Sequence, residues 1–173
     1  MSSLGSNNLL KKILSLAPII LLYVSVLNNF DFNYLGLSYF SFNFSYILIF
    51  YFSLKKSESL GYGLIFIAGL FNDVVVGLPI GISSLSYLLL CGAAAYLRNI
   101  TLRPSIIKDW MFFLLSILVI NSLSFIILDL IFKYQIKYLD QLINVGFTFL
   151  LYLFFSHSFD FFVKFFIGRN NAE

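Results

Sequence analysis

The stretch FNDVVVGLPIGIS carries the residues of this chain that are best suited to chemistry. It places Asp73 and Asn72 among apolar side chains, and Ser83, Ser84 and Ser86 follow within the next apolar run. An Asp at the centre of a lipid-facing helix costs about 2.5–3.5 kcal/mol, so such a residue usually faces the interior of a helical bundle. We therefore expect the Asp73 carboxylate to face inward, with the serine hydroxyls as its candidate hydrogen-bond partners.

Two roles for this carboxylate stay open on the sequence alone. It can cap a turn by accepting hydrogen bonds from free backbone amides, or it can line an internal polar pocket, and one side chain can do both. The turn itself has a clear origin: Gly77 and Gly81 can adopt positive φ, and Pro79 fixes φ near −65°. These residues predict a tight helical hairpin.

Other polar residues lie in apolar surroundings. Asn43, Asn121 and Ser124 are each expected inside a membrane span, where an interhelical hydrogen bond is a commoner role than a ligand contact. His157 and Asp160 are three residues apart on one helical face, which predicts an interfacial ion pair between them. The candidate residues for a pocket or a partner surface are Asn43, Asn72, Asp73, Ser83, Ser84, Ser86 and Asn121.

Motifs of enzymes and metal sites do not occur in the sequence. It has no H-E-x-x-H, no cluster of Cys or His, and no P-loop glycine pattern. The single Cys91 lies in an apolar run, where we expect it to act as a small buried residue. We expect no catalytic residue, no metal, no cofactor and no nucleic-acid partner.

The composition indicates the solvent in which these residues lie. The chain has 173 residues, of which 60% are hydrophobic and 11% charged, and its mean hydropathy is +0.93. A soluble domain is about half apolar and about a quarter charged. We therefore expect an all-α integral membrane protein with the lipid bilayer around most of its surface.

Six segments are apolar and long enough to be candidate membrane helices within a single domain, residues 1–173. The third and fourth are short and are separated only by the Gly-Leu-Pro-Ile-Gly turn. The expected spans are 13–30, 35–54, 61–76, 80–97, 110–132 and 141–163.

The distribution of basic residues predicts the orientation. With the N-terminus inside, nine Lys and Arg residues fall on the cytoplasmic side and only Lys133 and Lys137 on the other side. The positive-inside rule then favours six spans with both termini in the cytoplasm.

The segment from residue 43 to residue 97 resembles the rod shape-determining protein MreD family. An apolar span ends in an aromatic triplet, FYF at 50–52, and a short basic loop and a glycine-rich span follow. The family motif D-x-x-x-G-x-[PT]-x-G is complete here as Asp73, Gly77, Pro79 and Gly81. Two family prolines are missing, because Phe42 stands where the second span usually begins with Pro and no Pro follows Asn144.

The resemblance implies a fold and a set of partners. It implies six spans, similar to the substrate-binding subunits of energy-coupling-factor transporters, and no catalytic activity. It also implies a place in the bacterial inner membrane, within the cell-elongation complex that supports peptidoglycan synthesis. MreC would be the direct partner, and MreB, RodA and its transpeptidase would be more distant ones. The hairpin would then line an outward-facing pocket or stiffen the surface that holds MreC.

A vitamin-binding subunit of an energy-coupling-factor transporter is the alternative function. Such subunits dock through small residues spaced by four in the first span, whereas Ser15 and Ala17 are two apart. This spacing counts against the alternative. A lipid-modifying enzyme would need several acidic residues gathered on adjacent helices, and only Asp73 lies deep in a predicted span.

Overall fold

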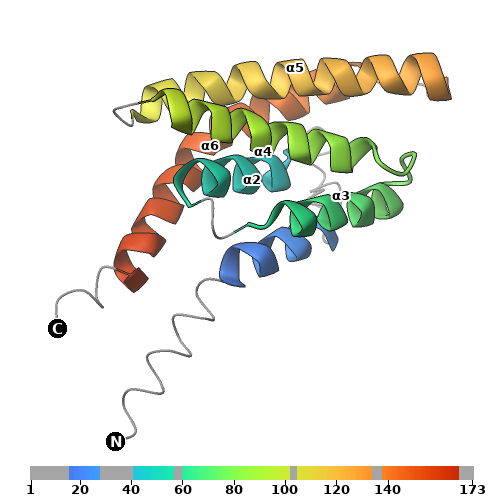
Figure 1. Cartoon of the computed structure of the whole chain (residues 1–173). Coiled ribbons are helices and arrows are strands. Elements are labelled where there is room, and N and C mark those ends of the chain that lie inside the picture. The colour runs from blue at the N-terminus through green and yellow to red at the C-terminus, as the bar shows by residue number, and fades with distance from the viewer. Residues whose placement is uncertain (1–15, 28–40, 57–59, 102–104, 134–137, 168–173) are drawn as a thin grey trace, which may run out of the picture.

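The computed structural model describes residues 16–27, 41–56, 60–101, 105–133 and 138–167. Over these ranges the chain is all-helical, with six helices and no strand (Figure 1). The helices are Leu16–Leu27, α2 (Phe44–Lys55), α3 (Tyr62–Val76), α4 (Ile82–Ile100), α5 (Ile106–Phe132) and α6 (Tyr138–Ile167).

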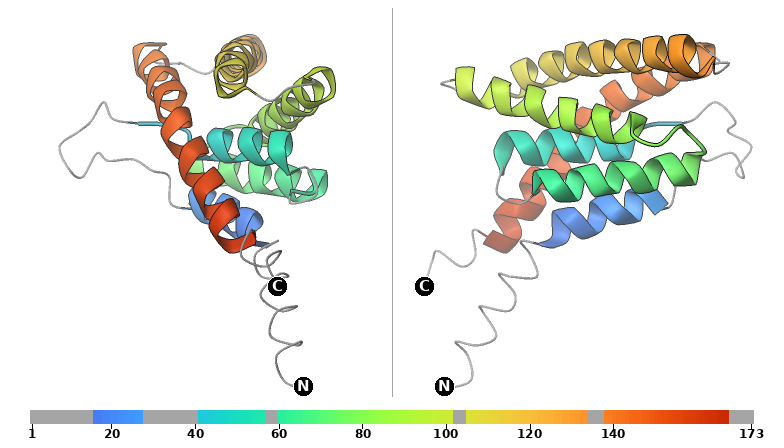
Figure 2. Two further views of the ribbon diagram at one scale, coloured as in Figure 1. Left: turned by 90° about the vertical axis from the view of Figure 1, so that its left-hand side faces the viewer. Right: turned by 45° about the vertical axis from the view of Figure 1, so that its right-hand side comes forward.

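Helix α2 lies at the centre of the bundle. Every residue from 45 to 54 is buried, as expected for a helix that is apolar on all sides. It packs against α4 and α6 (Figure 2). The Ser45 hydroxyl lies 2.7 Å from that of Ser25 in the first helix. This short helix is therefore enclosed by the longer ones.

Aromatic rings fill the space between α2, α5 and α6. The Phe113 ring stacks on Tyr152 at 4.5 Å between centroids and meets Phe50 at 5.0 Å. Trp110 stacks on Phe149 at 4.3 Å and donates its indole N–H to the Phe149 carbonyl at 2.8 Å. These contacts hold α6 against α5 and α2, because paired aromatic rings gain energy beyond that of the area they bury.

The remaining helices follow one another as antiparallel neighbours. Helix α3 packs on α4 as a hairpin, α4 packs on α5, and α5 packs on α6. The α3–α4 turn lies at the end of the bundle where α5 ends, and α5 begins at the opposite end, where α4 ends (Figure 1). The predicted hairpin is thus present.

Two helices are long and apolar enough to cross a membrane by length and composition, α5 and the part of α6 from Tyr138 to Lys164. The helices Leu16–Leu27, α2 and α3 are apolar but shorter. The predicted span 35–54 differs most from the structure, because α2 begins only at Phe44, and residues 35–40 lie outside the described ranges. Twelve residues of helix measure about 18 Å, which is less than the roughly 30 Å of a hydrocarbon core.

Candidate functional site

The Asp73 carboxylate binds the start of the next helix. Its side chain is completely buried, and its two oxygens accept hydrogen bonds from the backbone amides of Gly81 at 2.7 Å and Ser83 at 2.8 Å. Gly81 is the N-cap residue of α4 and carries no capping side chain of its own. An N-cap side chain normally binds the amides of the first helical turn, and negative charge is favourable there. Asp73 performs this role from the neighbouring helix.

The backbone of the same residue closes α3. The Asp73 carbonyl accepts hydrogen bonds from the amides of Gly77 and Leu78, the latter at 2.9 Å. Gly77 has φ +75° and Gly81 has φ +107°, and L-residues with a side chain rarely adopt either value. One residue therefore satisfies backbone groups at the end of α3 and at the start of α4. The predicted turn cap and the predicted positive φ at both glycines are present in the structure.

Side chains on the two helices continue this connection below the turn. The Asn72 amide donates to the Ser83 hydroxyl at 2.8 Å, and the Ser84 hydroxyl donates to the Phe66 carbonyl at 3.0 Å. A Cβ atom built on Gly69 would lie 2.4 Å from the Ser84 Cα, so the helix backbones touch at this point. The expectation that the serine hydroxyls bind the carboxylate was wrong, because these hydroxyls bind other groups and Asp73 is occupied by backbone amides.

Two contacts link the hairpin and α2 to α5. The Ser86 hydroxyl lies 2.8 Å from that of Ser124, and the Tyr46 hydroxyl donates to the Asn121 side-chain oxygen at 3.4 Å. Both are interhelical hydrogen bonds of the kind predicted for Asn121 and Ser124. Their distances indicate a good bond for the serine pair and a weak one for the tyrosine.

Asn43 lies at a different place from the one predicted. It is the N-cap of α2, not a residue within a span, and its side-chain oxygen accepts a hydrogen bond from the Tyr46 amide at 3.1 Å. Its own amide donates to the Thr148 hydroxyl of α6 at 2.8 Å. The Asn144 side chain donates to Ser41 at 3.1 Å. The start of α2 is thus fixed to α6 by polar contacts.

The ion pair predicted between His157 and Asp160 was wrong. Asp160 is bound instead by Lys55 of α2, whose ammonium group lies 2.8 and 2.7 Å from the two carboxylate oxygens, and by the Tyr51 hydroxyl at 2.7 Å. His157 is exposed on α6. A bidentate lysine from a neighbouring helix gives better geometry than a side chain three residues away on the same helix.

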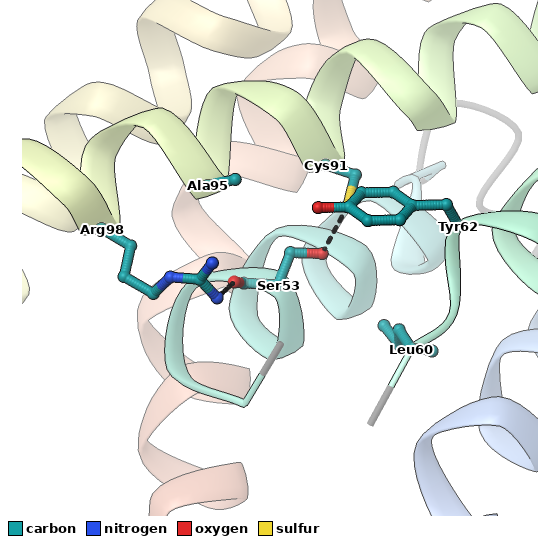
Figure 3. A pocket seen from close by; sticks show the side chains of 6 residues that line it. All are labelled: Ser53, Leu60, Tyr62, Cys91, Ala95 and Arg98. Atoms are coloured by element: carbon teal, nitrogen blue, oxygen red, sulfur yellow. Dashed lines mark hydrogen bonds between the residues drawn. The ribbon is translucent and has the colours of Figure 1, made fainter. Parts of the chain in front are cut away.

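The hairpin site is built for rigidity. Among the described residues, no side-chain nucleophile or base is bonded to Asp73. Both of its carboxylate oxygens accept hydrogen bonds from backbone amides. The hollow drawn in Figure 3 lies at the other end of the hairpin, where α4 ends, and its lining does not include Asp73. Within the described ranges no group of three or more His, Cys, Asp or Glu residues is arranged to hold a metal ion.

Three structural residues of the site were missed by sequence reasoning. Gly69 makes the closest backbone contact, Thr148 receives the Asn43 amide, and Tyr46 reaches α5. A glycine within a span that faces a serine-rich span was the one available signal, because small residues allow close helix packing. Cys91 is buried as expected, and it accepts a hydrogen bond from the Ser53 hydroxyl at 3.2 Å.

Comparison with known proteins gives no assignment. No protein-family model, no curated protein and no solved structure matches this chain.

Proposed function

We propose that this chain is an integral membrane protein with six spans and with both ends in the cytoplasm. The described basic residues support this orientation, because five lie toward one end of the bundle and one lies at the other. The first group comprises Lys55, Lys56, Arg98, Lys108 and Lys164, and the single residue is Lys133. By the positive-inside rule, the end with five basic residues faces the cytoplasm. The first three helices would then be completed by residues outside the described ranges or accommodated by local thinning of the bilayer.

The proposed function is that of an MreD-like component of the bacterial cell-elongation complex, which binds MreC and has no catalytic role. One observation carries this proposal: Asp73, Gly77 and Gly81 of the D-x-x-x-G-x-P-x-G motif together form one structural unit, the α3–α4 turn. Asp73 accepts hydrogen bonds from backbone amides at the end of α3 and at the start of α4, and Gly77 and Gly81 supply the two positive φ values. The motif that underlies the resemblance is thus a device for fixing a hairpin.

A fixed hairpin suits a scaffold better than a catalyst. Gly69 and Ser84 hold the two helices in backbone contact, and the Ser86–Ser124 bond ties the pair to α5. Binding to a rigid surface loses less conformational entropy than binding to a mobile one. The outer faces of α3 and α4 therefore present a shape that a membrane partner can recognise without ordering it.

Co-purification tests the proposal directly. The tagged chain is extracted in mild detergent from the bacterium that encodes it, and its bound proteins and small molecules are identified by mass spectrometry. We expect MreC among the proteins, and we expect depletion of the chain to round rod-shaped cells. A tightly retained vitamin together with an ATPase would instead establish the transporter alternative and refute the scaffold.

A matched pair of variants connects the partner to the hairpin. Gly69→Leu forces α3 away from α4, because a side chain at this position meets the Ser84 backbone. Gly92→Leu places the same side chain on α4 where nothing lies within 4 Å. We expect the first variant to lose MreC while remaining in the membrane and the second to retain it. Equal retention by both would show that the hairpin geometry does not position the partner.

A further inference from the structure

A hollow lies at the end of the bundle where α2 ends and α3 begins. It is shallow and partly open, with a cavity volume of about 10 Å³, which is room for about one water molecule. Its lining residues come from three parts of the chain and are Ser53, Leu60, Tyr62, Cys91, Ala95 and Arg98 (Figure 3). Pockets for drug-sized ligands measure about 300–1,000 Å³. This hollow is far smaller and cannot enclose a ligand, so a group bound here would lie across its mouth.

Arg98 places a positive charge at the hollow. Its guanidinium group donates one hydrogen bond, to the Ser53 carbonyl at 3.2 Å. Among the described residues the ion pair is between Lys55 and Asp160, so no described carboxylate neutralises Arg98. A guanidinium group has five N–H donors in a planar fork, a geometry that matches two oxygens of a phosphate. Among the described residues, the Ser53 carbonyl is the one acceptor bonded to these donors.

Tyr62 adds a second donor on the opposite wall. Its ring lies beside the Cys91 side chain, and its hydroxyl points toward the side on which Arg98 lies (Figure 3). The residue is 63% exposed, so this wall can be reached from outside. Leu60 and Ala95 supply apolar surface beside these polar groups. The hollow thus offers a cation, a hydroxyl and an apolar wall.

The position along the helices matches the level of lipid headgroups. Tyr62 is the first residue of α3, Ser53 lies in the last turn of α2, and Arg98 lies two residues before the end of α4. In a bundle that spans the bilayer, helix ends lie at the interface, where Tyr and Arg are typical anchors. Lys108, at the start of α5, adds to the positive potential at the same end.

We propose that the phosphate of an anionic phospholipid binds across the mouth of this hollow, with Arg98 and Tyr62 as its donors and the apolar wall beside the glycerol carbons. The proposal rests on the membrane location of the chain and not on MreC as its partner. A purely structural role for Arg98 is the competing explanation, because its bond to Ser53 satisfies a carbonyl in the last turn of α2. A change at Tyr62 distinguishes the two explanations, because no described group is hydrogen-bonded to its hydroxyl and its loss should therefore affect lipid binding alone.

Native mass spectrometry of the full chain in detergent tests the proposal. The protein is titrated with phosphatidylglycerol, with phosphatidylcholine as a zwitterionic reference and with inorganic phosphate as the free anion. We expect one saturable phosphatidylglycerol adduct, weaker binding of phosphatidylcholine, and little competition by inorganic phosphate, because the apolar wall favours a lipid. Displacement of the lipid by millimolar inorganic phosphate would instead identify a site for a free anion.

Four variants locate the site. Arg98→Gln removes the paired donors, and we expect it to lower the phosphatidylglycerol affinity by about tenfold, as for loss of a hydrogen-bonded charge. Arg98→Lys keeps the charge but not the fork and should recover only part of this loss. Tyr62→Phe should lower the phosphatidylglycerol affinity by about threefold to tenfold and leave the melting temperature unchanged. Lys108→Gln removes one charge at the same end but outside the hollow, so we expect no loss of the saturable adduct.

Two outcomes would overturn the proposal. Equal losses in Arg98→Gln and Lys108→Gln would show diffuse attraction by the basic end of the bundle. An unchanged affinity in Tyr62→Phe and Arg98→Lys, with destabilisation in Arg98→Gln, would show that Arg98 only caps α2. Failure of the MreC experiment would leave these results unaffected, because they measure lipid binding by the isolated chain.

Discussion

Removal of the Asp73 carboxylate tests the assignment of this residue as the link between two helix ends. In Asp73→Ala the amides of Gly81 and Ser83 lose their acceptor in a fully buried site. A buried donor left without a partner costs about 1–3 kcal/mol. Two such donors predict a loss of about 2–6 kcal/mol, and relief from burying the carboxylate brings our expectation to about 3 kcal/mol.

The neighbouring residue provides a matched control. Asn72 lies on the same helix and makes one neutral side-chain bond, to the Ser83 hydroxyl at 2.8 Å. Asn72→Ala should therefore cost about 1 kcal/mol. Asp73→Asn should fall between the two alanine variants, because one oxygen can still accept from Ser83 while the new NH₂ group faces the Gly81 amide.

Two measurements read these changes. Reversible unfolding in mixed micelles, by titration with sodium dodecyl sulfate, gives the free energy of unfolding. Amide hydrogen exchange at Gly81 and Ser83 reports the start of α4 alone and should accelerate in Asp73→Ala but little in Asn72→Ala. A stability loss in Asp73→Ala no larger than that in Asn72→Ala, together with unchanged exchange at these two amides, would refute the capping role.

Further predictions concern helix contacts. Gly69→Ala should destabilise the protein by about 2 kcal/mol, because the added Cβ would lie 2.4 Å from the Ser84 backbone and an overpacked core typically loses about 1–3 kcal/mol. Gly92→Ala should be neutral or stabilising by up to about 1 kcal/mol, since nothing lies within 4 Å and alanine favours the helix; the same unfolding titration compares the two, and equal effects would contradict the contact. A double-mutant cycle on Lys55→Gln and Asp160→Asn should give a coupling of about 1 kcal/mol, because this bidentate pair is only 28% and 26% exposed. A coupling near zero would show that the pair does not hold α2 to α6.

The hairpin could be predicted from the sequence because its determinants are local. The turn residues lie within nine positions of one another, and two apolar runs flank them. The prediction of a helix at 61–76 agrees closely with α3, Tyr62–Val76. The inward position of Asp73 followed from the cost of a carboxylate in lipid, and its complete burial agrees with that reasoning.

Other features depend on contacts that sequence spacing does not encode. Asn43 begins a helix because its amide meets Thr148, 105 residues away, and its side chain caps the first turn. The spacing of His157 and Asp160 indicates a shared helical face, but it cannot predict that Lys55 of α2 binds Asp160. Gly69 resembles any other helical glycine until the helix that crosses it is known.

The capping geometry also explains why aspartate suits position 73. The backbone amides of Gly81 and Ser83 donate to separate oxygens of the Asp73 carboxylate, at 2.7 and 2.8 Å. Asparagine offers one acceptor oxygen and serine a single hydroxyl oxygen, so neither can replace both bonds with the same geometry. Glutamate has both oxygens but adds a methylene group in a fully buried space. The choice of aspartate thus follows from the hydrogen bonds of the hairpin alone.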